Sequence, residues 1–362
     1  YTSSPSCSVK SFPFILDISL VIQNNRTVFL NADASVKCRR EESMAIYKED
    51  VAEFLWRNGE IIPWKDALIH VNSVGHASVA GIFEGIKAYW NEKDQELYVF
   101  RLRDHMVRFI NSIKMVRYGF AYDLAALEKA VLDLLRANKY KENIYIRPYV
   151  FQKGMVRELL QPQPGKPTEL VIDSWPFESY RSMDKILHVG VSSWVRISDH
   201  IMPPRLKCFS NYHNGRLAAM EATINGYDWP ILLDDAGKVT EGPGACLLIV
   251  RNNTIIAPPI TAGILESITR DTVEKIAKDL LNIGFVERTV DRTELYVADE
   301  IFYVGTGWEI MPVGSVDRIP VGDGKIGPVT QAAAEAYRNI VLGEVKKYHS
   351  WLTPVWNTKK GA

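Results

Sequence analysis

The order of the predicted strands and helices is the feature that most constrains the fold of this 362-residue chain. Strand and helix patterns alternate without the regular strand–helix–strand period of a dinucleotide-binding sheet. Neither a GxGxxG nor a GxxxxGK[ST] motif is present, which argues against Rossmann and P-loop folds. We therefore expect an α+β protein with a mixed sheet or a distorted barrel. The length favours two domains, because single cores seldom grow beyond about 250–300 residues.

The chain up to the proline-rich segment QPQPGKP predicts a first domain of about 130 residues. The Asn58-Gly59 pair is expected to turn a hairpin, and 144–151 alternates like a strand. Two amphipathic helices are expected between them, the first capped by Asp104 and the second with its apolar residues at 124–135. The proline-rich segment itself is expected to be a loop.

The rest of the chain predicts a second, larger set of strands and helices. Helices are expected near 212–225, 269–283 and 328–346. A hairpin is expected in CLLIVRNNTIIAPP, with its turn at the two asparagines. A strand is expected to break at the small residues 305–307.

Composition and charge exclude several classes of partner. The 43 acidic and 43 basic residues balance, so we expect no general attraction to nucleic acid or to a membrane surface. No apolar run reaches the roughly 18 residues of a membrane span. The four cysteines show no metal-ligand spacing, so no metal site is expected. They fit a reducing compartment, which predicts a cytoplasmic protein.

Residues 1–43 differ from the rest of the chain. They are rich in serine and then apolar, and no acidic residue precedes Asp17. We expect an extension that lies outside the fold. A segment that targets the chain to an organelle is the alternative.

Lys207 stands among apolar and small residues, just ahead of an Asn-Tyr pair and a predicted helix. The simplest interpretation is a surface lysine. A lysine in a partly desolvated pocket is instead an amine nucleophile, which can form a Schiff base with an aldehyde such as pyridoxal phosphate. That cofactor needs an acid near its ring nitrogen and donors for its phosphate.

Candidates for these partners occur along the chain. Glu241 precedes a Gly-Pro-Gly turn and could face the ring nitrogen, although it could equally be a loop acid. Ser267 and Thr269 open a predicted helix, where N–H groups bind phosphate, and the simpler interpretation is a helix cap. Arg108 could pair with a phosphate oxygen, and Arg147 with a substrate carboxylate or with a structural acid.

Together these segments resemble the fold-type IV pyridoxal-phosphate enzymes, specifically the branched-chain amino acid aminotransferases. The resemblance covers nearly all of 44–349 in the family's order. It rests on FEGIKAYW (83–90), VFRLRDHMVRF (99–109), YIRPYVF (145–151), VSSWVR (191–196), KCFSNYHNGRLAAMEA (207–222), EGPG (241–244), ITRDTVEKIAKDL (268–280), ADEIFYVGTGWEIMPV (298–313) and GPVT (327–330).

The resemblance implies two domains with the cofactor between them. A small α/β sandwich domain would span 44–172, and an interdomain loop 173–183 would lead to a larger pseudo-barrel α/β domain at 184–350. Residues 351–362 would form a tail. The resemblance also implies a homodimer or higher oligomer, in which a loop of the partner lies near the substrate pocket.

The resemblance further implies roles for single residues. Lys207 would hold the cofactor as an aldimine, Tyr212 would hydrogen-bond its O3′, and Glu241 would meet its ring nitrogen. The remaining cofactor ligands, which would hold the phosphate, are Arg108, Ser267, Ile268, Thr269 and Thr306. The residues that would line the substrate site are Phe83, Tyr145, Arg147, Thr306, Gly307 and Trp308.

The implied reaction moves the amino group of leucine, isoleucine or valine to 2-oxoglutarate, so amino acids and 2-oxo acids are the expected partners. Several positions depart from the family pattern: Glu266 and Ser267 replace Pro and Gly, Trp308 replaces Ala, Cys246 replaces Asn, and Ser78 stands where Tyr is common. Two alternatives therefore stay open. One is a D-amino acid or (R)-amine transaminase or an aminodeoxychorismate lyase, and the other is a noncatalytic homologue that binds the cofactor.

Overall fold

The computed structural model describes residues 52–160, 163–178 and 185–357. The extension predicted over 1–43 lies outside this part of the chain, as do the last residues of the predicted tail. In the described ranges no helix is long and apolar enough to cross a membrane.

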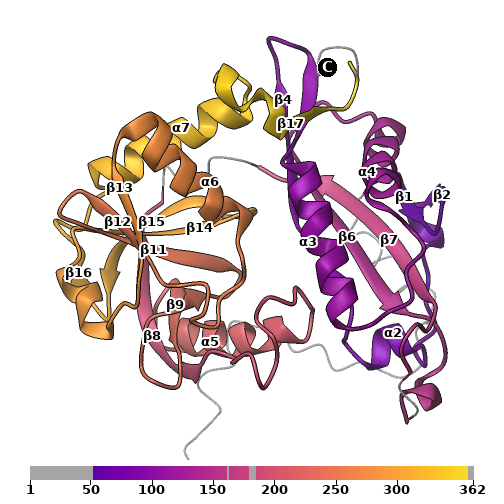
Figure 1. Ribbon diagram of the computed structural model, residues 1–362, viewed down its shortest axis with the longest axis horizontal. Coiled ribbons are helices and arrows are strands. Elements are labelled where there is room, and N and C mark those ends of the chain that lie inside the picture. Colours follow the sequence, from indigo (N-terminus) through magenta and orange to yellow (C-terminus); the bar gives the residue numbers. More distant parts are fainter. Residues whose placement is uncertain (1–51, 161–162, 179–184, 358–362) are drawn as a thin grey trace, which may run out of the picture. The chain divides into compact units, whose positions relative to one another are not determined.

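The first sheet is antiparallel throughout, and its strands follow the order β17-β5-β4-β6-β7-β1-β2, with β3 paired to β6 (Figure 1). The predicted hairpin at Asn58 is confirmed, because β1 and β2 pair across it. The strands are β1 (Phe54–Arg57), β2 (Glu60–Pro63), β3 (Ile82–Phe83), β4 (Ile86–Asn91), β5 (Glu96–Phe100), β6 (Ile144–Gln152), β7 (Thr168–Pro176) and β17 (Leu352–Pro354).

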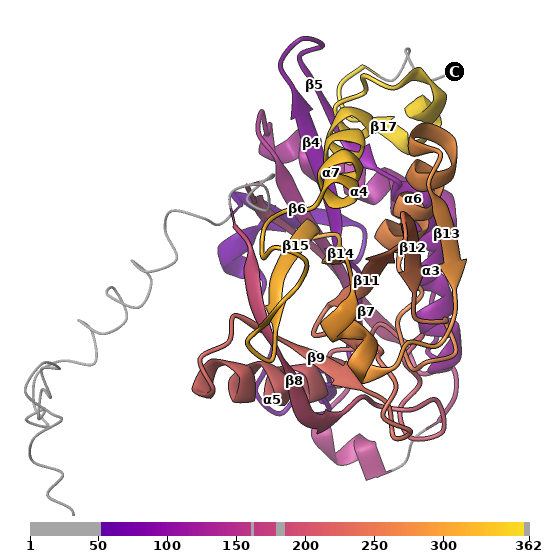
Figure 2. The same ribbon diagram turned by 90° about the vertical axis from the view of Figure 1, so that its left-hand side faces the viewer.

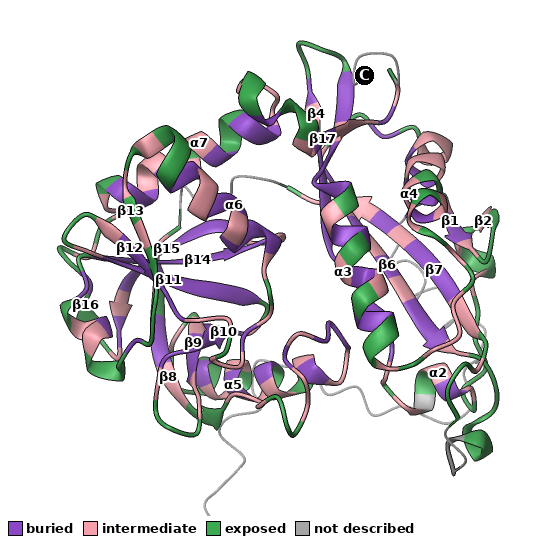
Figure 3. Cartoon of the chain, in the orientation of Figure 1, coloured by how far each residue is buried: buried purple, intermediate pink, exposed green. Residues whose placement is uncertain are grey.

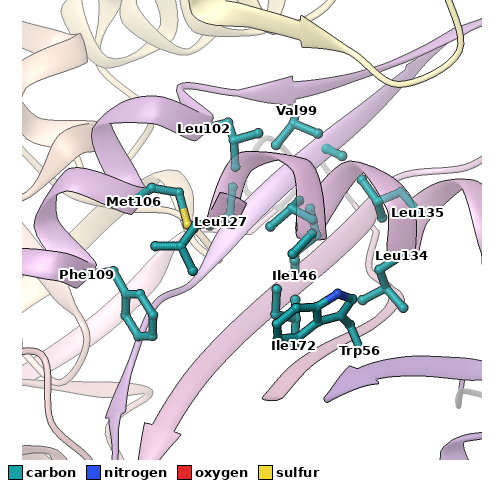
Figure 4. Packing of buried hydrophobic residues seen from close by; sticks show 14 of the residues in the cluster. Trp56, Val99, Leu102, Met106, Phe109, Leu127, Leu134, Leu135, Ile146 and Ile172 are labelled. Carbon is teal, nitrogen blue, oxygen red and sulfur yellow. The ribbon is translucent and has the colours of Figure 1, made fainter. Parts of the chain in front are cut away.

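Helices α3 (Leu102–Met115) and α4 (Leu124–Asn138) pack on this sheet, as their apolar spacing predicts. Buried and exposed residues alternate along α3 (Figure 3). The buried side chains meet strand residues in one core (Figure 4). Those labelled from the helices are Leu102, Met106, Phe109, Leu127, Leu134 and Leu135, and those from the strands are Trp56, Val99, Ile146 and Ile172.

The helix starts differ from each other in their caps. Asp123 caps α4, since its side chain accepts the Ala126 N–H at 2.8 Å. The predicted cap Asp104 is wrong, because α3 already begins at Leu102 after Arg101, which has a φ of +50°. The Asp104 carboxylate instead accepts a hydrogen bond from Nε of Arg101 at 2.6 Å.

The second sheet is mixed, which confirms the prediction, and its strands follow the order β13-β12-β11-β14-β15-β8-β9. Parallel pairs join β8 to β9, β15 to β8 and β12 to β13, while the remaining pairs are antiparallel. The strands are β8 (Leu187–Val195), β9 (Trp229–Leu233), β10 (Glu241–Gly242), β11 (Ala245–Arg251), β12 (Thr254–Ala257), β13 (Gly284–Glu287), β14 (Glu300–Gly305), β15 (Glu309–Val316) and β16 (Ile319–Pro320).

Three predicted helices accompany this sheet. Helix α5 (Asn211–Ile224) lies against β8 and β9, while α6 (Ile268–Ile276) and α7 (Pro328–Val341) lie together on the other side (Figures 1 and 2). Helix α6 continues as a π-helical turn, Ala277–Leu281. Helix α7 ends five residues before the predicted 346, where Gly343 has a φ of +76°.

Shorter helical segments complete the described chain. They are α2 (Val74–Ala77) and the turns Trp64–Asp66, Val156–Leu160, Arg292–Val297 and Lys346–Trp351.

Two predicted domain limits differ from the observed elements. Strand β7 continues to Pro176, and Asp173 pairs with Arg147 and Trp175 with Tyr145, so the predicted loop at 173–183 cannot begin before Phe177. The predicted tail contains β17, which pairs with β5 through Leu352 and Phe100. In both places the segment pairs with the second edge of a strand that also pairs with β4, which satisfies its backbone N–H and C=O groups. The division into two domains itself stays a prediction.

Candidate active site

Side chains from both sheets line a cavity of about 370 Å³. Of the predicted site residues, only Thr269 is not on its wall. The predicted residues on the wall are Phe83, Arg108, Tyr145, Arg147, Lys207, Tyr212, Glu241, Ser267, Ile268, Thr306, Gly307 and Trp308. Residues as far apart in the sequence as Phe83 and Trp308 therefore meet in one place.

Lys207 is buried and points its amine into this cavity. Its backbone is fixed on both sides, since its carbonyl accepts the Phe83 N–H at 3.0 Å and its N–H donates to Oγ of Ser112 at 3.3 Å. Nζ of Lys207 donates to the hydroxyl of Tyr212 at 2.6 Å and lies 4.7 Å from the centre of the Phe83 ring. Tyr212 is in the first turn of α5, so the start of this helix sets the position of the hydroxyl.

Glu241 is the buried acid of the cavity. Its Oε1 lies 2.7 Å from Nη2 of Arg196, and its carboxylate accepts the Leu265 N–H at 3.4 Å and the thiol of Cys246 at 3.6 Å. Burial raises the pKa of Glu241, although the positive charge of Arg196 opposes this rise. The carboxylate is therefore a better proton acceptor than an exposed glutamate.

Arg108 is the cation at another part of the wall. Its Nε and Nη2 bond both oxygens of Glu84 at 2.7 and 2.8 Å, and Nδ1 of His105 lies 2.8 Å from the same carboxylate. Burial by itself lowers the pKa of Arg108, but the Glu84 carboxylate more than offsets this and the pKa is raised. The remaining nitrogen, Nη1, donates to the carbonyl of Glu266 at 2.8 Å, so the guanidinium is fixed beside the start of α6.

The start of α6 faces the cavity through Ser267 and Ile268. Ser267 is the N-cap, since its hydroxyl accepts the Arg270 N–H at 3.2 Å. Thr269, also considered as the cap, is buried in the first turn behind these residues. The first N–H groups of a helix bind anions well, and the adjacent Arg108 adds positive charge.

Glu266 would repel an anion at this helix start if its side chain faced the cavity. Its carboxylate instead pairs with Nε of Arg205 at 2.7 Å and is about half exposed. Arg205 also lies 3.5 Å from Asp199. The Glu266 carboxylate is therefore neutralised by Arg205 and does not line the cavity.

Aromatic side chains form the apolar part of the wall. The ring of Tyr145 lies 5.0 Å from Trp175 and 5.4 Å from Phe177, measured between centroids. A Cβ on Gly85 would lie only 1.9 Å from the Tyr145 hydroxyl, so this position needs glycine. The sequence prediction missed Trp175 and Phe177, and also Arg196, because aromatic residues and single arginines in strands are usually structural.

Two buried donors on this wall have no hydrogen-bond partner among the described residues, Nε of Arg147 and Nε1 of Trp229. The guanidinium of Arg147 stacks 4.9 Å from the Trp175 ring. An unsatisfied buried donor costs about 1–3 kcal/mol, so acceptors on a ligand would stabilise both groups.

Trp308 and Ser78, two departures from the family pattern, differ in position. Trp308 lies on the wall and packs against Trp229 with a centroid distance of 4.8 Å. Ser78 is not among the lining residues, and its hydroxyl donates to the Val74 carbonyl at 2.7 Å. The added tryptophan therefore reshapes the pocket directly, whereas the serine ends α2.

The arrangement combines groups that suit one type of ligand. A buried amine, a phenol, a buried carboxylate and a cationic helix start match the aldehyde, the O3′, the ring nitrogen and the phosphate of pyridoxal 5′-phosphate. The unpartnered Nε of Arg147 adds a donor for a carboxylate. The residues present thus fit this cofactor and an acid substrate.

Comparison with known proteins agrees with this chemistry. Residues 81–316 match the family of class IV amino-transferases. A branched-chain-amino-acid aminotransferase of Salmonella typhimurium is 38% identical over 307 residues, covering 84% of this chain and 98% of that protein. A probable branched-chain-amino-acid aminotransferase of Aquifex aeolicus is 36% identical over 307 residues, covering 84% and 97%.

Solved structures give the same result. The branched-chain amino acid aminotransferase of Thermobaculum terrenum in its PLP form has a TM-score of 0.80 and 42% identity, covering 85% of this chain and 99% of that chain. The branched-chain aminotransferase of Thermoproteus uzoniensis with norvaline has a TM-score of 0.79 and 40% identity, covering 84% and 100%.

Proposed function

Because this chain belongs to the branched-chain-amino-acid aminotransferase family of the class IV aminotransferases, we propose that it moves the amino group of leucine, isoleucine or valine to 2-oxoglutarate, with pyridoxal 5′-phosphate as cofactor. The observation that supports this most directly is the amine of Lys207, buried 2.6 Å from the Tyr212 hydroxyl in a cavity that also contains Glu241.

We assign each group of the cofactor to the residues whose chemistry matches it. When bound, pyridoxal phosphate supplies an aldehyde carbon that condenses with amines and a ring that withdraws electrons from the substrate's α-carbon. Tyr212 would donate to O3′, and Glu241, kept in place by Arg196, would accept from the ring nitrogen. The residues proposed to hold the phosphate are Arg108, Ser267, Ile268 and Thr306. Thr269, which does not line the cavity, would contribute only its backbone N–H in the first turn of α6.

Lys207 is proposed as the base and acid of the reaction. Its Nζ would take the proton that leaves the substrate's α-carbon and later return it, which requires a free amine within reach. The hydrogen bond to Tyr212 directs Nζ, and the fixed backbone at Phe83 and Ser112 limits its travel. Burial of the cavity wall reduces the access of water to this proton.

The substrate would be recognised by the aromatic side chains of the cavity wall and by Arg147. The rings of Phe83, Tyr145 and Trp308 offer apolar contact to a branched side chain, and the guanidinium of Arg147 can pair with a carboxylate. An apolar pocket separates substrates by only about 1–3 kcal/mol per methylene. We therefore expect modest selectivity among leucine, isoleucine and valine.

A panel of amino donors tests the proposal. The holoenzyme would be mixed with L-leucine, D-alanine, (R)-1-phenylethylamine or aminodeoxychorismate, and the absorbance of the cofactor followed. Loss of the absorbance of the lysine-bound cofactor with L-leucine alone is the expected result. A response to one of the other donors instead would favour a D-amino acid or (R)-amine transaminase or a lyase, and no response to any donor would favour a noncatalytic homologue.

Lys207→Ala gives the first prediction for this reaction. The variant is expected to lose the cofactor absorbance typical of a lysine adduct and at least about 100-fold in turnover, because the proton carrier is removed. Lys93→Ala is the control, since Lys93 is exposed and pairs with Glu344 at the surface. A normal reaction of Lys207→Ala with L-leucine would contradict the assignment.

We also propose a homodimer. Exposed apolar side chains around α2 and the turn Val156–Leu160 support a contact surface there, including Leu68, Val71 and Met155. Sedimentation of the holoenzyme would test it, with Leu68→Asp expected to weaken the association.

The cytoplasmic location stays a prediction, which fractionation of expressing cells would test.

A further inference from the structure

The turn between β14 and β15 presents Thr306, Gly307 and Trp308 to the cavity. The strands pair up to Gly305 opposite Glu309, so the turn consists of only these three residues. Glu309 has a φ of +54°, in the left-handed region that favours glycine. A glutamate in this conformation carries more strain than a glycine would.

The side chain of Glu309 is bound by the first sheet. Its Oε1 lies 2.5 Å from Nζ of Lys87, and both side chains are buried, at 5% and 1% exposed. The Tyr89 hydroxyl donates to the same oxygen at 3.1 Å and lies 3.3 Å from the Tyr337 hydroxyl. Nζ of Lys87 also donates to the Glu178 carbonyl at 3.4 Å.

Lys87 thereby connects three parts of the cavity wall, which are the Thr306–Trp308 turn, Tyr145 and Phe177. It lies on β4 opposite Tyr145 of β6, and its Nζ is 5.0 Å from the centre of the Phe177 ring. A Cβ on Gly307 would lie 3.8 Å from Tyr145 and 4.0 Å from Phe177, so the turn packs directly against these two rings. A shift of the turn would therefore change the wall on both sides.

The Lys87–Glu309 ion pair is difficult to explain by its contribution to stability alone. Removing two charges from water costs free energy, and an apolar pair of similar volume is often as stable or more stable. What an ion pair adds is a defined direction and distance, and here it fixes a strained residue next to a three-residue turn. We propose that Lys87 and Glu309 are positioning residues, which hold the Thr306–Trp308 turn in place on the part of the cavity wall that would contact the substrate.

Binding of 4-methylvalerate to the holoenzyme, measured by calorimetry, tests the inference without turnover. This probe has the carboxylate and the branched chain of the proposed substrates but no amino group, so the choice of probe rests on the proposed function. In Lys87→Met the dissociation constant is expected to rise at least about tenfold, because a misplacement of about 1 Å at a site can cost up to 100-fold. In Lys87→Arg, which keeps the charge, it is expected to stay within about threefold of the wild type.

The double variant Lys87→Met/Glu309→Gly separates positioning from folding. It removes both buried charges and places glycine at the left-handed position, so its melting temperature is expected to return close to that of the wild type. Its dissociation constant is expected to remain about tenfold raised, because the turn has lost its anchor. Lys93→Met, which breaks only the exposed pair with Glu344, should change neither value.

Two results would overturn the inference. One is a double variant that binds 4-methylvalerate within about twofold of the wild type, and the other is a Lys87→Arg variant that binds as weakly as Lys87→Met. Failure of the proposed function would look different. The wild type itself would then bind no 4-methylvalerate and would transfer no amino group from L-leucine, which would overturn both proposals together.

Discussion

The hydroxyl of Tyr212 lies 2.6 Å from the Lys207 amine on the wall of the cavity. The residue types that chemistry demands, an amine, an acid and an arginine, could be predicted from the sequence because each has a clear role with an aldehyde cofactor. The residues that hold these groups in place could not be predicted from the sequence. Arg196 and Glu84 reach Glu241 and Arg108 only through the fold, since the ion pairs span 45 and 24 residues of sequence.

At the residue scale, Trp308 is predicted to limit the size of the substrate pocket, because its ring lies on the cavity wall. Trp308→Ala would open space next to Trp229, so kcat/KM for phenylalanine relative to leucine is expected to rise about tenfold. Initial rates with both donors would measure this ratio. Trp194→Ala, at an exposed position outside the cavity, should leave the ratio unchanged, and an unchanged ratio in Trp308→Ala would show that its ring does not limit the pocket.

Glu84 makes the stability of the first sheet dependent on pH. Burial by itself raises the pKa of Glu84, but Arg108 and then His105 lower it overall. A carboxylate with a lowered pKa stabilises the folded state above its ordinary pKa of about 4.3, and this contribution is lost as the pH falls through the folded-state value. Glu84→Gln is therefore expected to lower the free energy of unfolding by about 3–5 kcal/mol at pH 7.

The pH dependence provides the check for Glu84. The difference between the wild type and Glu84→Gln in urea unfolding should shrink as the pH falls below about 4.3. Glu344→Gln serves as the control, because its carboxylate is exposed and should cost less than about 1 kcal/mol. A difference that stays constant down to pH 3 would mean that folding does not lower the pKa of Glu84.

At the scale of elements, long segments with a clear period were predictable and their ends were not. Helix α4 and strand β6 follow their apolar spacing from end to end. The start of α3 differs from the prediction because Arg101 is bound by distant groups, the Ile268 carbonyl and Asp271. Local capping signals do not include such contacts.

The contribution of helix α3 to the free energy of unfolding is expected to come from its buried face. Phe109→Ala would leave a cavity between α3 and the first sheet and should lower the free energy of unfolding by about 3–5 kcal/mol. Val107→Ala on the exposed face of the same helix is the matched control and should change it by less than about 0.5 kcal/mol. Urea unfolding midpoints would compare the two, and equal losses would contradict the assigned faces.

For the whole molecule, the end of the described chain returns to the first sheet. Strand β17 pairs with β5, and the buried Glu96 accepts the N–H groups of Val355, Trp356 and Asn357 at 3.0, 2.8 and 2.8 Å. Strand β4 belongs to both cores, since Ile86 packs in the first and Tyr89 in the second. The two sheets are thus connected through β4.

A truncation tests this connection. A chain that ends at Ser350 would leave Glu96 buried without these three donors, and hydrogen bonds to charged groups contribute about 1.5–3 kcal/mol each. We expect a loss of about 5 kcal/mol or more, seen as a lower melting temperature of the holoenzyme. A chain that ends at Asn357 should melt like the full chain, and equal melting of both truncations would show that β17 is dispensable.

The sequence by itself determined the periodic helices and strands and the types of group that a pyridoxal site requires, because spacing and side-chain chemistry are local properties. Only the tertiary structure decided which groups support them. Arg196 reaches Glu241, Arg205 pairs with Glu266 outside the cavity wall, and Lys87 reaches Glu309 across 222 residues. Such pairs depend on where the chain folds back, and the free energy of a buried charge depends on every neighbour that the fold brings to it.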